Sequence, residues 1–156
     1  MVHEFHQTQN LPLPLEEAWN FLSDPRNLCR ITPPHMGFAI LSRHVPGRMH
    51  AGMIVTYRVR PFPFLPLRWV TEITHVREPE YFVDEQRFGP YVFWHHQHFL
   101  REIPGGVEME DLIHYKVPGW IFGRLLEPLV VRPQLQRIFA YRRTKLVELF
   151  GDWKKE

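Results

Sequence analysis

The feature that most limits the fold is a long run of strand and turn sequence that ends in one amphipathic helix. Between residues 37 and 117, alternating stretches are broken at short intervals by proline and glycine, a pattern typical of antiparallel strands joined by turns. The strands are expected near residues 38–45, 53–60, 67–77, 81–88, 92–103 and 107–117. One apolar helix must cover this whole meander, so we expect the sheet to curl around it and to leave a cavity between them.

Four further elements frame this run. An alternating first strand comes before it, and two helices follow that strand. Apolar side chains recur at three- and four-residue steps in the first of these helices. A long helical segment ends the chain. These elements are expected over residues 2–9, 15–24, 25–31 and 120–150. Pro128 and Pro133 should kink or split the first half of the last helix, because a proline removes a helical hydrogen bond.

The composition indicates one folded domain that spans residues 1–156. A hydrophobic content of 44%, with twelve Phe and five Trp, argues against disorder. The net charge is only +2, and acidic and basic residues are interspersed, so we expect no nucleic-acid partner. The single Cys29 excludes an internal disulfide, and no signal peptide or membrane-span pattern is present, so we expect a cytoplasmic protein. The oligomeric state is left open.

Three of the ten histidines fall within residues 92–100, in one expected strand. Side chains alternate between the two faces of a strand, so Trp94, His96 and His98 share one face. His95 then lies on the opposite face. A buried polar group is costly unless it is hydrogen-bonded, so these imidazoles either have partners on neighbouring strands or line a cavity.

An aspartate on the following strand is expected to point inward. Asp111 alternates with apolar residues on the buried face, where an unpaired carboxylate would be costly. If the hairpin between the two strands has a two-residue loop at Gly105-Gly106, His96 and His98 share the face of Asp111. A three-residue loop would bring His95 inside instead. Spacing alone leaves both registers open.

Four short motifs are spread along the second half of the chain. They read Phe82-x-Asp84-x-Gln86, Gly89-Pro-Tyr-x-x-Trp94-x-His96-x-His98, Asp111-x-x-x-Tyr115-x-x-Pro118 and Arg132-Pro-x-Leu-x-x-Ile-Phe-x-Tyr-Arg142. Together they resemble a bacterial branch of the START-like, or SRPBCC, superfamily, and the resemblance covers nearly the whole chain. It implies an α+β helix-grip fold: a seven-stranded antiparallel sheet curled around a long C-terminal helix, with two short helices after strand 1.

The resemblance also implies a ligand cavity between the sheet and the C-terminal helix. The residues that it favours as inward-facing and ligand-binding are Asp84, Gln86, Trp94, His96, His98, Asp111 and Tyr115. We therefore expect a protein that binds a small apolar or amphipathic molecule, lipid- or polyketide-like, with these residues at the polar end. The superfamily mixes lipid carriers, hormone receptors and polyketide cyclases, so the resemblance does not separate a carrier from an enzyme.

Two alternative functions follow from the histidines. The first is a cyclase- or dehydratase-like enzyme that uses His98 or His96 with Asp111 as an acid–base pair. The second is a metal-dependent cupin-like protein, because His96-x-His98-x-x-x-Glu102 comes close to the first motif of a cupin. The missing second histidine motif and the long C-terminal helix oppose the cupin hypothesis, so no metal and no cofactor is assigned.

The segment Pro61-Phe-Pro-Phe-Leu-Pro66 is unusually apolar for a connection between strands. One interpretation is that it packs over the end of the helix. The other is a lid or mouth that touches greasy ligands or a membrane. In that second case Phe62, Phe64 and Leu65 would make transient membrane contact.

Overall fold

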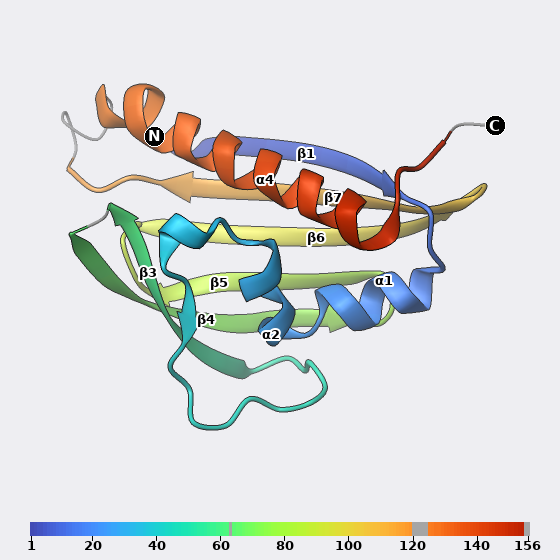
Figure 1. The fold of residues 1–156 in the computed structure, drawn as a ribbon. Coiled ribbons are helices and arrows are strands. Elements are labelled where there is room, and N and C mark those ends of the chain that lie inside the picture. Colours follow the sequence, from blue (N-terminus) through green and yellow to red (C-terminus); the bar gives the residue numbers. More distant parts are fainter. Residues whose placement is uncertain (63, 120–124, 155–156) are drawn as a thin grey trace.

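The computed structural model describes residues 1–62, 64–119 and 125–154. Its main feature is a seven-stranded sheet, antiparallel throughout, in the order β1-β7-β6-β5-β4-β3-β2 (Figure 1). The strands are β1 (His3–Leu11), β2 (Ala39–Ile40), β3 (Met53–Phe62), β4 (Leu65–Arg77), β5 (Tyr81–Phe88), β6 (Phe93–Ile103) and β7 (Gly106–Lys116). The first and last strands of the sequence, β1 and β7, are therefore neighbours in the sheet.

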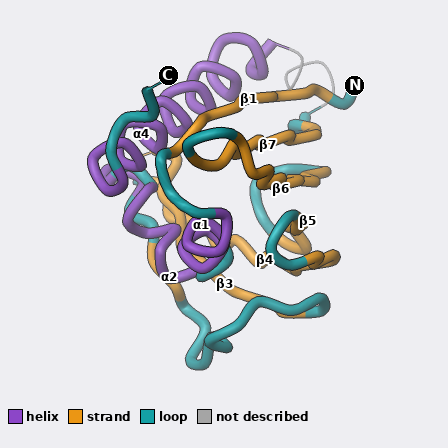
Figure 2. The backbone as a smooth tube through the Cα atoms, turned by 90° about the vertical axis from the view of Figure 1, so that its right-hand side faces the viewer, coloured by secondary structure: helices purple, strands orange, loops and turns teal. Residues whose placement is uncertain are grey.

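The helices all lie on one face of this sheet, which curves around them (Figure 2). Helix α4 runs along β1 and β7, and α1 and α2 lie beside it over the middle strands (Figure 1). The helical elements are α1 (Leu15–Leu22), α2 (Pro25–Leu28), two 3-10 turns (Cys29–Ile31 and Pro34–Met36), a π-helical turn (Glu127–Val131) and α4 (Arg132–Phe150). The predicted α+β fold, a seven-stranded antiparallel sheet curled around the C-terminal helix, is confirmed.

The β6–β7 hairpin determines which side chains face α4. Its loop has two residues, as predicted, but they are Pro104 and Gly105, since Ile103 pairs directly with Gly106. A proline followed by a glycine with φ of +79° is the pattern of a type II turn. The shift from the predicted Gly105-Gly106 loop moves the register by two residues, which leaves every side chain on its predicted face.

One predicted strand is mostly wrong. Within the segment 38–45, only Ala39 and Ile40 pair with β3. At Ser42 a hydrogen bond through the side chain takes the place of a backbone hydrogen bond to β3. The hydroxyl of Ser42 accepts the backbone N–H of Thr56 at 2.8 Å, so the ladder to β3 ends there. Pro46 follows in the loop and has no N–H with which to resume pairing.

The C-terminal helix departs from a regular α-helix where prolines were predicted to disturb it. Pro128 lies within the π-helical turn, and Pro133 follows as the second residue of α4, which continues directly from that turn. The missing N–H of Pro133 therefore removes a helical hydrogen bond at the irregular turn. The predicted helix began at residue 120, and residues 120–124 lie outside the described part of the chain. Among the described helices, none is long and apolar enough to cross a membrane.

Candidate functional site

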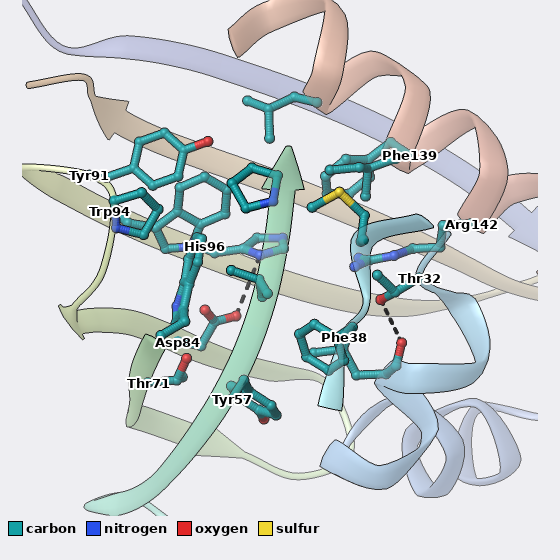
Figure 3. Close-up of a pocket in the computed structure, with 18 of the residues that line it drawn as sticks. Thr32, Phe38, Tyr57, Thr71, Asp84, Tyr91, Trp94, His96, Phe139 and Arg142 are labelled. Atoms are coloured by element: carbon teal, nitrogen blue, oxygen red, sulfur yellow. Dashed lines mark hydrogen bonds and ion pairs between the residues drawn. The ribbon is translucent and has the colours of Figure 1, made fainter. Parts of the chain in front are cut away.

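A pocket of about 600 Å³ lies between the curved sheet and helix α4 (Figure 3). Strands β3 to β7, the turns around α2 and helix α4 contribute its lining, which is mainly apolar. The charged and imidazole groups of the described lining are gathered on one wall. They are Asp84 of β5, His96 and His98 of β6, Asp111 of β7 and Arg142 of α4.

Strand register brings the first four of these groups together. His98 lies directly opposite Asp111 in the β6–β7 pair, and His96 lies directly opposite Asp84 in the β5–β6 pair. Side chains at such paired positions point to the same face with Cβ atoms about 4.5–5.5 Å apart. The hairpin therefore places two imidazoles between two carboxylates before any side chain is considered.

Asp111 holds both histidines from the buried side. It is fully buried, and its Oδ1 atom lies 2.9 Å from Nε2 of His96 and 2.9 Å from Nδ1 of His98. The guanidinium of Arg142 comes within 3.7 Å of the same oxygen. This side chain also stacks over the ring of Phe139 at 4.5 Å, so α4 brings a buried cation to the cluster.

Asp84 approaches the same two rings from the pocket side. Its Oδ2 atom lies 2.8 Å from Nε2 of His98. The same atom lies 3.4 Å from Nδ1 of His96 (Figure 3). The centroids of the two imidazoles are 3.7 Å apart, and the ring of His98 stacks on Phe82. Each imidazole thus has a carboxylate oxygen near both of its nitrogens.

The contacts of the cluster favour an additional proton on one of its histidines. Two neutral imidazoles carry only two N–H groups for four nitrogen–carboxylate contacts. Burial opposes a charge on His98, but its contacts with Asp111 and Asp84 outweigh burial and raise its pKa. Burial and the neighbouring His98 lower the pKa of His96. Of the two rings, His98 is therefore the one whose charged form the cluster favours.

The carboxylates of the cluster are held ionised. Burial alone would raise the pKa of Asp111, but the hydrogen bonds from His96 and His98 hold it well below its usual range. The same two rings lower the pKa of Asp84 against the effect of burial. The guanidinium of Arg142, 3.7 Å from Oδ1 of Asp111, adds positive charge beside these carboxylates.

Five of the seven predicted site residues line the pocket. These are Asp84, Trp94, His96, His98 and Asp111. His95 lies outside the lining, where its Nδ1 is 2.7 Å from Oε1 of Glu85, so the structure selects the register with His96 and His98 inside. Trp94 packs edge-on against Trp69 beside Tyr91, and this aromatic group forms the wall next to His96.

Gln86 and Tyr115 lie outside the lining of the pocket. The amide of Gln86 donates to the carbonyl of Tyr91 at 2.7 Å and accepts the N–H of Tyr91 at 3.1 Å, which closes the β5–β6 loop. A Cβ on Gly89 would lie 2.3 Å from the amide oxygen of Gln86, so a larger residue there would displace this amide. The hydroxyl of Tyr115 instead donates to the buried Glu127 at 2.5 Å.

Arg142 is the functional side chain that the sequence interpretation left unassigned. It is 8% exposed and lines the pocket. Its sequence signal is position: Arg142 falls three residues after Phe139 and four before Leu146, which places it within the buried stripe of α4. A cation in an apolar stripe indicates a buried anionic partner, here Asp111.

No family model and no curated protein matches the chain, but solved structures do. The chain is similar to the Zhui aromatase/cyclase from Streptomyces sp. R1128 (12% identity, 96% of this chain and 93% of that one, TM-score 0.71). It is also similar to Ara h 8.0201 (13%, 95% and 99%, TM-score 0.62). A third similar structure is Ms6760 from Mycobacterium smegmatis (17%, 94% and 92%, TM-score 0.66). The chain therefore has the helix-grip fold.

Proposed function

We propose that this protein binds a small apolar or amphipathic molecule, lipid- or polyketide-like, in the pocket between the sheet and α4. One observation carries the proposal: a volume of about 600 Å³ with a mainly apolar lining has its charged groups on a single wall. Small-molecule sites typically combine such a lining with a few placed polar groups, at about 300–1,000 Å³. A ligand with one polar end fits this division.

The polar end of the ligand would meet Asp84 and the histidines. The side chains of Asp84 and His98 are 19% and 15% exposed, and both line the pocket. They offer an acceptor and a donor to a guest. Among the described residues, Oδ2 of Asp111 and Nε of Arg142 are buried without a hydrogen-bond partner, so the wall has further polar capacity.

A fluorescence titration tests this proposal. We expect the amphipathic probe 1-anilinonaphthalene-8-sulfonate to bind and to be displaced by medium-chain fatty acids, and native mass spectrometry to show a co-purified mass. Val59→Trp fills the pocket and should weaken probe binding at least about tenfold, or about 1.4 kcal/mol. Ile54→Trp, on the same strand but exposed and outside the lining, should leave binding unchanged. Equal binding by both variants would refute the proposal.

The partner proposed for the rim of the pocket is a membrane surface. Phe62, Phe64 and Leu65 are 41%, 86% and 42% exposed, and the first and last of them line the pocket. The β5–β6 loop and the start of the last helical segment lie at the same end of the molecule (Figure 1). They add further exposed apolar side chains: Phe88, Val92, Phe93, Leu125, Leu126 and Leu129. An apolar end around a pocket suits transient contact with lipid.

Three interpretations of the sequence stay predictions. The cyclase- or dehydratase-like alternative has its acid–base residues, His98, His96 and Asp111, at the pocket wall, but no reaction is assigned. The cytoplasmic location and the single domain over residues 1–156 also stay predictions.

A further inference from the structure

Three metal-ligating side chains converge on the pocket side of the cluster. One ligand atom from each of Asp84, His96 and His98 lies within 4.8 Å of the other two. A tetrahedral ion with bonds of about 2.1 Å separates its ligand atoms by about 3.4 Å. Nδ1 of His96 and Nε2 of His98 are 3.4 Å and 2.8 Å from Oδ2 of Asp84, so the group is near the spacing that an ion needs.

The buried side of the cluster orients these nitrogens. Both rings place their other nitrogen 2.9 Å from the same atom, Oδ1 of Asp111. If each ring donates its single N–H to Asp111, lone pairs on His96 and His98 are left facing a carboxylate oxygen of Asp84. Three acceptors that face one another repel unless a cation lies between them. Metal-bound histidines typically donate their second N–H to a carboxylate in this way.

We propose that Asp84, His96 and His98 bind a divalent transition-metal ion, with Asp111 fixing the two histidines from behind. Two imidazoles and a carboxylate suit Zn²⁺, Fe²⁺ or Mn²⁺. All three ligands line the pocket, so the ion keeps a coordination position toward the ligand space. The ion and Arg142 together outweigh the charges of Asp84 and Asp111 by one positive unit. The fourth position therefore suits an oxyanion, such as a carboxylate or an enolate.

This inference deepens the proposed function, because the ion would anchor the polar end of the same ligand. The two ideas still fail separately. Binding of the apolar probe is measured with chelator present, and metal binding is measured with no organic ligand. Probe binding without metal binding would overturn only the metal site, and metal binding without probe binding would overturn only the ligand proposal.

The chain supplies a matched control on the same two strands. His95 and Glu85 form a histidine–carboxylate pair on the opposite face of β5 and β6, at 2.7 Å. This pair has one imidazole and one carboxylate at a partly exposed position, against two imidazoles and two carboxylates in the pocket. His95→Gln therefore reports non-specific binding by surface histidines.

The test is titration of the chelator-treated protein with ZnCl₂ and with CoCl₂. Calorimetry measures the binding of both ions, and visible absorption reports the coordination of Co²⁺. We expect one equivalent of either ion per chain, and the visible bands of Co²⁺ in a low-coordinate site. His98→Gln should abolish this binding, and Asp111→Asn should weaken it about 10–100-fold, as other residues that orient metal-bound histidines do. His95→Gln should bind as the unaltered chain does.

Two results would overturn the proposal. One is the absence of stoichiometric binding by the unaltered chain, and the other is binding that survives in His98→Gln but is lost in His95→Gln. Circular dichroism checks that each variant is folded. If His98→Gln does not fold, X-ray absorption of the unaltered chain with Zn²⁺ decides the question. Two imidazole ligands and a carboxylate support the site, and a shell without imidazole refutes it.

Discussion

Replacing Asp111 by asparagine removes one negative charge from a fully buried position and nearly preserves its shape. In the structure this carboxylate faces His96 and His98 at 2.9 Å each, and Arg142 at 3.7 Å. Of the two carboxylates in the cluster, only Asp84 would then remain beside the two imidazoles and the guanidinium of Arg142. We expect a large loss of stability, because buried charge is costly once its partner is removed.

The contacts set the magnitude. A hydrogen bond to a charged group contributes about 1.5–3 kcal/mol, so the two contacts at 2.9 Å contribute about 3–6 kcal/mol together. The asparagine oxygen retains one neutral hydrogen bond of about 1 kcal/mol. The expected loss in the free energy of unfolding is therefore about 2–5 kcal/mol, which overlaps the range of about 3–5 kcal/mol seen when a buried ion pair loses one partner.

Urea unfolding in the presence of chelator measures this loss. At about 2–4 °C per kcal/mol for a chain of this size, the melting temperature should fall by about 4–20 °C. Glu85→Gln is the control, because Glu85 pairs with His95 on the opposite face and its side chain is 25% exposed. That change should cost less than about 1 kcal/mol. Equal losses in the two variants would refute the account of Asp111 as the centre of a buried charged network.

The remaining predictions concern the apolar end and the sheet. Phe64→Ser should lower the affinity for lipid vesicles, measured by co-sedimentation, about 10- to 100-fold. This corresponds to the loss of about 1.5–3 kcal/mol from burying one Phe side chain in the lipid. Ile54 is also exposed but lies at the far end of β3, so Ile54→Ser should leave the affinity for vesicles unchanged. A similar loss of affinity in both variants would contradict membrane contact at the apolar end. Gly106→Ala should cost about 1–3 kcal/mol in urea unfolding, because its Cβ would lie 2.0 Å from the carbonyl oxygen of Leu11. Gly47→Ala, with open space around it, should change stability by less than about 0.5 kcal/mol, and equal costs would contradict the close approach of β1 and β7.

The fold could be predicted because turns and alternation are local signals. The proline and glycine breaks mark where the strands end, and the period-two pattern of β7 places Asp111 on the buried face. The hairpin loop was predicted one position late, but its even length kept His96 and His98 on the correct face. The edge strand failed because Ser42 ends its pairing through a side-chain hydrogen bond, which alternation does not reveal.

The site could be predicted only where strand pairing extends the pattern. Asp84 pairs with His96, but the β5–β6 ladder ends one residue later at Glu85. Gln86 therefore reaches the adjoining loop rather than the pocket, although it alternates with Asp84. Tyr115 shares the face of Asp111, yet its hydroxyl is taken by Glu127, a residue from the π-helical turn. Contacts between distant elements have no signature in spacing.

The cost of burying charged groups bears on whether the cluster stabilises the sheet or recognises a ligand. Replacing a buried ionic group by well-packed apolar residues of similar volume is often neutral or stabilising by about 1–4 kcal/mol. A fully apolar wall, with leucine at Asp84 and Asp111, phenylalanine at His96 and His98 and methionine at Arg142, should therefore be as stable as the unaltered chain or more so. If the cluster serves only to hold the sheet together, this variant keeps its affinity for amphipathic ligands and the unaltered chain binds no Zn²⁺. If the cluster recognises the polar end of a guest, the stable variant still binds a purely apolar molecule but loses both Zn²⁺ and the preference for an amphipathic one. The two roles are separated by two measurements on this variant and on the unaltered chain. Urea unfolding gives the stability of each, and titration with decane and with decanoate gives the preference of each for an apolar or an amphipathic ligand.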